Sequence, residues 1–294
     1  MLDVDAKDRF QVINLFKEGV FWIIHIGALL VIWTGISWVA AVVCILLYLI
    51  RMFAITGGYH RYFSHRTFET NRFFQFILAF LGAMAAQKGP IWWSSHHRHH
   101  HKHSDTEEDV HPPALYGIWW AHVGWVLSSR YVGTRKELVR DLLAIPELRW
   151  LDNYHWIAPL SLATLCYGFG TFLAAYYPNL NTNGFQMLIV GFCLSTTLLY
   201  HGTFCINSFC HIIGKKRFNT SDQSKNSLLM ALITLGEGWH NNHHRYPGSE
   251  KQGFYWWEID ITHYTLKFLS LFGIVWNLRV PPERIYEEAR RRPA

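Results

Sequence analysis

Two long windows without a charged side chain constrain the fold of this chain more than any other feature. Neither Gly19–Ile50 nor Asn153–Gly214 contains an Asp, Glu, Lys or Arg. As a single helix the first window would be about 48 Å long at about 1.5 Å per residue, well beyond a hydrocarbon core of about 30 Å. Each window has turn-forming residues near its middle, TGIS at 34–37 and YPNLNTNG at 177–184. The windows therefore predict four membrane spans in two hairpins, at about 18–34, 37–57, 156–176 and 185–206.

The composition agrees with a membrane protein. Hydrophobic residues make up 50% of the chain and charged residues only 16%, against about a quarter charged in ordinary soluble domains. The net charge of +6 could suggest a nucleic-acid partner, but the 14 Trp and the uncharged windows fit a membrane surface better. We therefore expect the bilayer as a partner and no nucleic acid.

The basic residues predict the topology. None of the 27 Lys and Arg lies in either hairpin loop, so the positive-inside rule places both chain ends and the segment between the hairpins in the cytoplasm. The apolar stretch 72–93 is expected to be an interfacial or protein-buried helix, because a fifth crossing would put His60 and His96 on opposite faces. The predicted fold is an all-α integral membrane protein, a single domain over 1–294, with a cytoplasmic helical cap formed by 58–152 and 207–294.

Histidines are concentrated in the segments beside the predicted spans. The stretch HHRHHHKH at 96–103 contains His97, His100 and His101, whose i, i+3, i+4 spacing places them on one face of a helix. The same spacing recurs at His240, His243 and His244. One such cluster could be a solvated metal-binding tract, but its repetition favours a built metal site. The overlapping frame of His96, His99 and His100 also fits the pattern; we prefer the His97 frame.

Two smaller groups complete the set. His60 and His65 are five residues apart and would differ by about 140° around an α-helix, so we expect them to bind different metal ions. Asn207 and His211 are one turn apart and face the same way. The nine histidines of the four groups are too many for one tetrahedral zinc ion and suit two ions. Imidazole ligands alone do not distinguish iron from copper, zinc or nickel.

Acidic residues near these groups are candidates for orienting the ligands through their second ring nitrogens. The alternative for each is a solvated surface charge. The candidate acids are Asp105, Glu107, Glu108, Asp109 and Glu237; His96, His99 and His103 are further candidates for the same role.

With these motifs in view, the chain resembles the membrane fatty acyl desaturases of the stearoyl-CoA desaturase type, in a bacterial-like form. The resemblance rests on HRYFSHRTF, HRHHHKHSDTEEDVH, AHVGWVL, NSFCHIIG and GEGWHNNHHRYP and extends over nearly the whole chain. It implies two irons in an all-histidine shell. By motif, one iron would take His60, His101, His211, His240 and His244; the other would take His65, His97, His100 and His243, with a water held by Asn207.

The resemblance also implies the reaction and its partners. O₂ and two electrons would remove two hydrogens from an unactivated acyl chain and leave a cis double bond. We expect an acyl-CoA substrate, although Ser95 and His96 stand where animal members have Arg-Asp, which leaves an acyl-lipid substrate open. No haem-binding HPGG and no cysteine iron–sulfur motif is present, so a separate electron donor of the ferredoxin, rubredoxin or cytochrome b5 type is expected. The expected location is a bacterial inner membrane. Cys44 and Tyr48 on the second span are candidates for the far end of the acyl tunnel.

Three other functions remain open at this point. The same scaffold could hydroxylate a fatty acyl chain or an alkane. A membrane metal transporter would place ligands near the middle of the bilayer. Here the nine candidate histidines lie at the ends of the predicted spans, and only His25 lies well inside one. A zinc hydrolase would need a Glu in an HExxH-like position, and none occurs.

Overall fold

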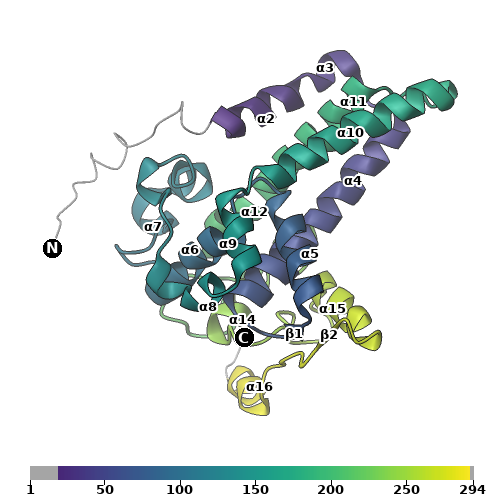
Figure 1. Ribbon diagram of the computed structural model, residues 1–294. Helices are drawn as coiled ribbons and strands as arrows, with labels where there is room; N and C mark the ends of the chain where they lie inside the picture. The colour runs from purple at the N-terminus through teal and green to yellow at the C-terminus, as the bar shows by residue number, and fades with distance from the viewer. Residues whose placement is uncertain (1–18, 292–294) are drawn as a thin grey trace.

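The computed structural model describes residues 19–291, and this part of the chain is almost entirely helical (Figure 1). Three helical segments are long and apolar enough to cross a membrane. They are Trp38–Ser64, made of α4 (Trp38–Phe53) and the π-helix η1 (Ala54–Ser64); α10 (Ile157–Tyr176); and Gly184–His211, made of α11 (Gly184–Met187), η6 (Leu188–Leu194), α12 (Ser195–Ser208) and η7 (Phe209–His211). These three segments match the spans expected at 37–57, 156–176 and 185–206, and the first of them runs on to Ser64.

The segment expected as the first span is shorter. It forms α2 (Gly19–Leu29) and α3 (Val31–Thr34), which together are too short to be counted with the other three. The expected start of this span at residue 18, and both chain ends, lie outside the described residues. In Figure 1 these helices extend together with α4, α10 and α11 away from the rest of the molecule.

Turns occur at both predicted positions, and their residues hydrogen-bond to each other. Ser37 caps α4 by accepting a hydrogen bond from the backbone N–H of Ala40 (3.1 Å), after Gly35 adopts a left-handed φ of 64°. On the other hairpin the short 3₁₀ turn η5 (Pro178–Leu180) precedes α11. The hydroxyls of Ser37 and Thr182 lie 2.5 Å apart, and Gln186 donates to the backbone oxygen of Thr34 (2.9 Å). The two loops therefore form one joined end of the helical bundle.

Arg51 lies within the second span and is 1% exposed. Its guanidinium donates to Thr196 (2.7 Å), to Ser195 (2.6 Å) and to the backbone oxygen of Met84 (3.2 Å). An arginine inside an apolar span is tolerated when protein groups accept its hydrogen bonds. Arg51 is therefore paired inside the protein.

The remaining helices form a cap at the other end of the bundle (Figure 1). The stretch 72–93 is divided between α5 and the start of α6, so it is not a fifth span. Gly82 of α5 lies against the ring of Tyr59, where an added Cβ would come within 2.2 Å. The first part of the cap contains α5 (Arg72–Ala83), α6 (Pro90–His103), α7 (Pro113–Tyr116), η2 (Trp120–Gly124), η3 (Ser129–Tyr131), η4 (Lys136–Leu138), α8 (Arg140–Leu143) and α9 (Pro146–Asn153).

The chain after the last long helix closes over this first part of the cap. Its helices are α13 (Leu228–Ile233), α14 (His240–Arg245), α15 (Ile261–Leu271) and α16 (Glu283–Arg290). Two short antiparallel strands, β1 (Glu69–Thr70) and β2 (Val275–Trp276), pair Glu69 with Trp276 and join the two parts of the cap. This arrangement brings α14 beside α6 and η1, so that distant histidine motifs meet.

Candidate metal centre

The π-helical pitch of η1 decides where His60 and His65 point. The backbone N–H of His65 donates to the oxygen of His60 (3.2 Å), an i→i+5 bond of the π-helical type. Residues five apart then lie on the same side of the helix, and the two imidazole rings are 4.8 Å apart between centroids. The side-chain nitrogens of the two histidines therefore lie in one group, and their binding to different ions stays a prediction.

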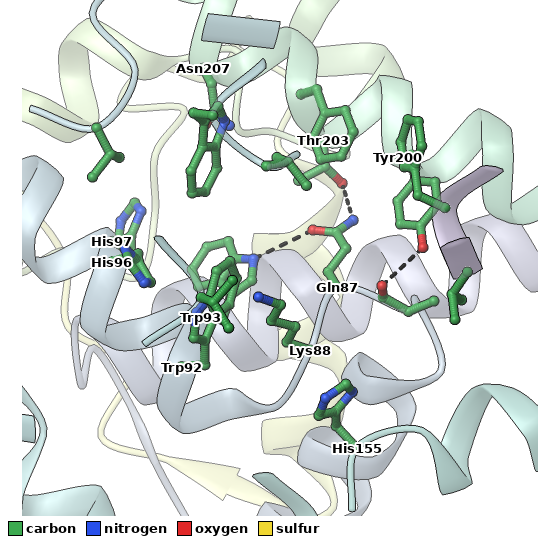
Figure 2. A pocket seen from close by; sticks show the side chains of 18 of the residues that line it. Gln87, Lys88, Trp92, Trp93, His96, His97, His155, Tyr200, Thr203 and Asn207 are labelled. Carbon is green, nitrogen blue, oxygen red and sulfur yellow. Dashed lines mark hydrogen bonds between the residues drawn. The ribbon is translucent and has the colours of Figure 1, made fainter. Parts of the chain in front are cut away.

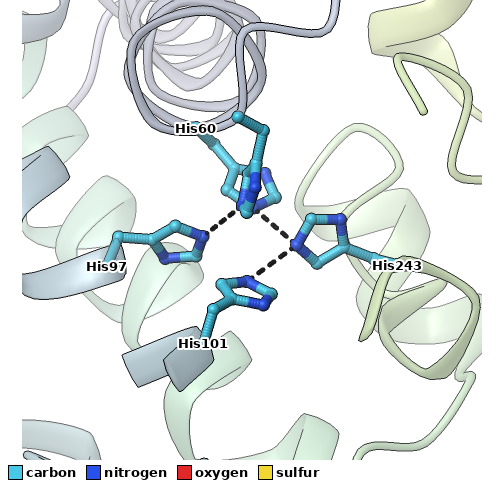
Figure 3. Close-up of side chains that lie close together, drawn as sticks. His60, His97, His101 and His243 are labelled. Atoms are coloured by element: carbon cyan, nitrogen blue, oxygen red, sulfur yellow. Dashed lines mark hydrogen bonds between the residues drawn. The ribbon is translucent and has the colours of Figure 1, made fainter. Parts of the chain in front are cut away.

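The nine predicted histidines form two adjoining groups. Within each group, one side-chain nitrogen per residue lies within 4.8 Å of all the others. Figure 3 shows the rings of His60, His97, His101 and His243, which come from η1, α6 and α14, turned toward a common centre. The first group is His60, His65, His97, His101 and His243; the second group is His100, His211, His240 and His244.

Helices α6 and α14 each contribute to both groups. On α6, His97 and His101 are one turn apart and belong to the first group, whereas His100 points to the second. On α14, His243 joins the first group and its neighbour His244 joins the second. The rings of His101 and His244 are 4.5 Å apart between centroids, so the groups are in contact. The HxxHH frame that begins at His97 is therefore the one that reaches the site.

The grouping differs from the assignment implied by the family resemblance. That assignment placed His60 and His101 with the residues of the second group and His100 with those of the first. In the structure His60 follows its π-helical neighbour His65, and its Nε2 lies 3.1 Å from Nε2 of His243. His100 and His101, which are adjacent on α6, lie in different groups, as the resemblance also implies.

Four carboxylates hold the outer nitrogens of the ligand rings. Nδ1 of His60 lies 2.5 Å from Glu237, and Nδ1 of His100 lies 2.9 Å from Asp109. Nδ1 of His211 lies 2.8 Å from Asp105, and Nδ1 of His244 lies 2.8 Å from Asp222. An Nδ1–H that donates to a carboxylate leaves Nε2 with a free lone pair and fixes the ring direction, as is common for metal-binding histidines.

Three of the five predicted acids have this role, and one acid that the sequence did not indicate has it too. Glu107 and Glu108 are exposed and do not contact the ligand rings. Asp222 was missed because it lies in a polar turn, where its Oδ1 accepts from the backbone of Ser224 (2.9 Å), a pattern that predicts only an Asx-turn. No spacing relates it to His244.

The three histidines expected to orient the ligands do not contact the second ring nitrogens of the ligand histidines. Nε2 of His96 lies 3.1 Å from the backbone oxygen of Gly133, and Nε2 of His99 lies 2.8 Å from that of Glu108. Nδ1 of His103 pairs with the Glu108 side chain at 3.0 Å. These three side chains instead connect α6 to the surrounding loops.

Burial keeps much of the centre in the form that binds metal. Burial, followed by the charge of neighbouring histidines, holds the pKa of His97, His101, His240 and His243 well below the usual range. For Asp109 burial acts in the opposite direction, but the neighbouring His100 outweighs it and lowers the pKa. Metal binding requires neutral imidazole. Neutral nitrogens surrounded by ionised carboxylates make a donor set suited to cations.

His244 gives the clearest sign that the groups fit a metal ion. Its Nδ1 is held by Asp222, while its buried Nε2, which faces the other members of the second group, has no hydrogen-bond partner among the described residues. Buried polar atoms without a partner are rare in native proteins. A metal ion coordinated by this nitrogen would satisfy it.

A cavity of about 400 Å³ adjoins the first group. Figure 2 shows His97 and Asn207 on one side of it and Tyr200 on the other. Gln87 lies in the cavity wall between them. Its side chain donates to Thr203 (3.1 Å) and accepts from Nε1 of Trp93 (3.4 Å). Most of the other wall residues are apolar or aromatic, among them Phe21, Trp92, Val110, Trp125, Val126 and Phe204. A long apolar molecule could therefore lie beside the metal ligands.

Cys44 and Tyr48, the expected tunnel-end residues, do not line this cavity. The hydroxyl of Tyr48 donates to the backbone oxygen of Ile233 (2.7 Å), which holds its ring between α4 and α13. The expectation came from the family resemblance alone. The wall is instead formed by α12, the segments 86–97 and 110–132, and the ends of α2 and α10 with the residues just before α10.

Comparison with known proteins agrees with this geometry. The fatty acid desaturase family model matches residues 36–272. The chain is 36% identical over 293 residues to an acyl-CoA C20 Delta5-desaturase of Anemone leveillei, covering 96% of this chain and 89% of that protein. It is 35% identical over 268 residues to an sn-2 palmitoyl-lipid 9-desaturase of Nostoc sp., covering 89% and 88%, and 33% identical over 275 residues to an sn-1 stearoyl-lipid 9-desaturase of Anabaena variabilis, covering 92% and 96%. The predicted resemblance is confirmed, and the chain belongs to the fatty acid desaturase family.

Proposed function

We propose that this protein is a membrane desaturase that introduces a cis double bond into a long fatty acyl chain. O₂, two electrons and two protons are consumed, two hydrogens leave the chain, and two molecules of water form. The observation that carries the proposal is the contact between an apolar cavity and two groups of buried histidines. Two irons bound by these groups would activate O₂, the oxidant that breaks an unactivated C–H bond.

The residues of the cavity would position the chain and exclude water. Aromatic side chains such as Trp92 and Trp93 provide apolar surface for a methylene chain. The hydrogen-bonded pair of Gln87 and Thr203 restricts the path of the chain past the first group. His97 and Asn207 line the same cavity, so the carbons next to them would be the ones that react. Excluding water from this position protects the reaction from competing chemistry.

The proposed membrane arrangement has four spans in two hairpins. The described part of the first span, Gly19–Thr34, is about 24 Å long at about 1.5 Å per residue. The joined loops at Ser37 and Thr182 support two hairpins of the same direction. The cap contains most of the basic residues of the described chain, which supports a cytoplasmic cap and cytoplasmic chain ends in a bacterial inner membrane.

Electrons would come from a separate protein that docks on the loop following η7. The backbone N–H of Gln223, an exposed residue, donates to Asp105 (2.7 Å), and the same carboxylate oxygen lies 2.8 Å from Nδ1 of His211. Two hydrogen bonds thus connect the surface to a ligand of the second group. Lys215 and Lys216 are exposed on the same loop, which suits an acidic donor of the ferredoxin, rubredoxin or cytochrome b5 type.

The proposal is tested by expressing the full chain in a host that lacks its own desaturase and analysing the fatty acids by mass spectrometry. We expect new monoenes, each lighter than its precursor by two hydrogens, and about two irons per purified chain. The His243→Ala variant serves as the inactive control. A product heavier by one oxygen would identify a hydroxylase, and the absence of any product with iron and reductant supplied would refute the proposal.

A further inference from the structure

The link between α5 and α6 contributes to the cavity wall and has a strained backbone. This link, residues 84–89, is not helical, and Ala86, Gln87 and Lys88 within it line the cavity. Ala86 has a φ of 57° and Lys88 has a φ of 65°, in the left-handed region that glycine adopts freely and other residues adopt at a cost. Such residues keep this conformation only where the surrounding structure holds them in it.

Two side chains of the second span hold the link near its ends. Nη1 of Arg51 on α4 donates to the backbone oxygen of Met84 (3.2 Å). The hydroxyl of Tyr59 on η1, whose side chain is fully buried, donates to the backbone oxygen of Lys88 (3.2 Å). One continuous helical segment therefore contacts both the first part and the last part of the link.

A third contact holds the middle of the link. The hydroxyl of Tyr200 on α12 donates to the backbone oxygen of Ala86 (2.9 Å; Figure 2). The ring of Tyr200 is stacked on Phe204 (5.6 Å between centroids) and on His25 (5.9 Å), so its hydroxyl has a fixed direction. Because the direction of this carbonyl depends on the φ and ψ angles of Ala86, the hydrogen bond favours the left-handed conformation.

Gln87 lies between the two strained residues, so its direction depends on their backbone angles. Its side-chain nitrogen donates to Thr203 (3.1 Å), and its side-chain oxygen accepts from Nε1 of Trp93 (3.4 Å). A return of Ala86 to an ordinary φ would turn the Cα–Cβ bond of Gln87. The amide would then no longer reach both of its partners in the cavity wall.

We propose that Tyr200 is a positioning residue that sets the position of the new double bond through the backbone of Ala86. Together with Arg51 and Tyr59, it keeps the link in its strained form. Gln87 then stays in the cavity wall and fixes which carbons of the acyl chain lie beside the metal ligands. This inference rests on the proposed desaturase function and adds the origin of its regiospecificity.

The test removes a single hydroxyl. Tyr200→Phe keeps the ring and its stacking but takes this donor away from the backbone oxygen of Ala86. Tyr48→Phe is the matched control, because Tyr48 also donates to a backbone oxygen, that of Ile233 (2.7 Å), and does not line the cavity. The full-length variants and the wild type are expressed in a host that lacks its own desaturase, and double-bond positions in the products are measured by mass spectrometry.

We expect one dominant double-bond position from the wild type and from Tyr48→Phe. In Tyr200→Phe the ratio of that isomer to its neighbours should fall about fivefold, the size expected for the loss of one neutral hydrogen bond, with iron content unchanged. An unchanged ratio in Tyr200→Phe, or the same fall in Tyr48→Phe, would overturn the inference and leave the desaturase function intact.

A second substitution separates a backbone role from a direct contact between the hydroxyl and the acyl chain. Ala86→Gly lowers the cost of the left-handed φ, so adding it to Tyr200→Phe should restore most of the lost ratio. If the double variant gives the same mixture as Tyr200→Phe, the hydroxyl does not act through Ala86 and the inference is wrong.

The contact itself is tested without turnover. The backbone N–H groups of Ala85 and Ala86 donate hydrogen bonds within the preceding turn (3.0 Å each), so deuterium exchange at these amides reports opening of the link. In the iron-loaded protein, exchange should be about fivefold faster in Tyr200→Phe than in the wild type or Tyr48→Phe. Equal exchange in all three would overturn the inference whatever the activity, whereas no product from an iron-loaded, reduced wild type would refute the proposed function and this inference with it.

Discussion

Replacing Asp105 with Asn should weaken one metal site and leave the other unchanged. Asp105 accepts two hydrogen bonds at Oδ2, from Nδ1 of His211 (2.8 Å) and from the backbone N–H of Gln223 (2.7 Å). Burial raises the pKa of this carboxyl, but the hydrogen bond from His211 outweighs it and the net shift is downward, so the group is ionised at pH 7. An amide oxygen in the same place can accept both bonds but carries no charge.

The expected size of the effect follows from these contacts. Carboxylates that hold a metal-binding histidine typically contribute about 10–100-fold to metal affinity, which corresponds to about 1.4–2.7 kcal/mol. The amide nitrogen of Asn would take the place of Oδ1, which has no partner in the described structure, so no bond is lost. Asp105 has a φ of 60°, a conformation that Asn tolerates well. The free energy of unfolding should therefore change by less than about 1 kcal/mol.

The assay is a competitive iron titration of the purified protein against a chelator, with metal content measured by mass spectrometry. The wild type should bind two ions, and Asp105→Asn should lose affinity at one site only, that of the second group. Glu107→Gln is the control, because Glu107 is an exposed acid on the same loop; it should leave both affinities unchanged. An equal loss at both sites, or the same loss in Glu107→Gln, would refute the reasoning.

Three further substitutions test other parts of the structure. His243→Ala removes a ligand of the first group and should reduce the metal content from two ions to about one and abolish product formation, whereas His103→Ala, outside both groups, should retain both ions. Gly82→Ala should destabilise the protein by about 1–3 kcal/mol, measured by thermal unfolding in detergent, because its Cβ would meet a buried tyrosine ring at 2.2 Å; Gly168→Ala, which faces open space, should not. Thr203→Val removes an acceptor of the glutamine that crosses the cavity wall; we expect a mixture of double-bond positions in the product, and a single unchanged position would contradict the role given to that contact.

Much of this protein follows from sequence because its strongest signals are local. A window without charge predicts a membrane helix whatever the rest of the chain does, and the HxxHH spacing identifies ligands on α6 and α14 because it depends only on α-helical geometry. The approach of His60 to His65 did not follow, because it depends on the π-helical pitch of η1, and no residue preference specifies that pitch; the assignment of each histidine to an ion stays a prediction. Asp222 could not be identified either, since only the tertiary fold brings its turn next to His244.

A change in the π-helical stretch Ala54–Ser64 would affect metal binding without affecting membrane insertion. A π-helix needs more residues than an α-helix to make each turn, so deleting one residue here, for example Gly57, would let the segment return to ordinary pitch. His60 would then rotate by about 100° relative to His243, while the apolar surface of α4 that precedes it would be unaltered. Such a chain would still insert into the bilayer with its two loops joined. It would not assemble its first metal site.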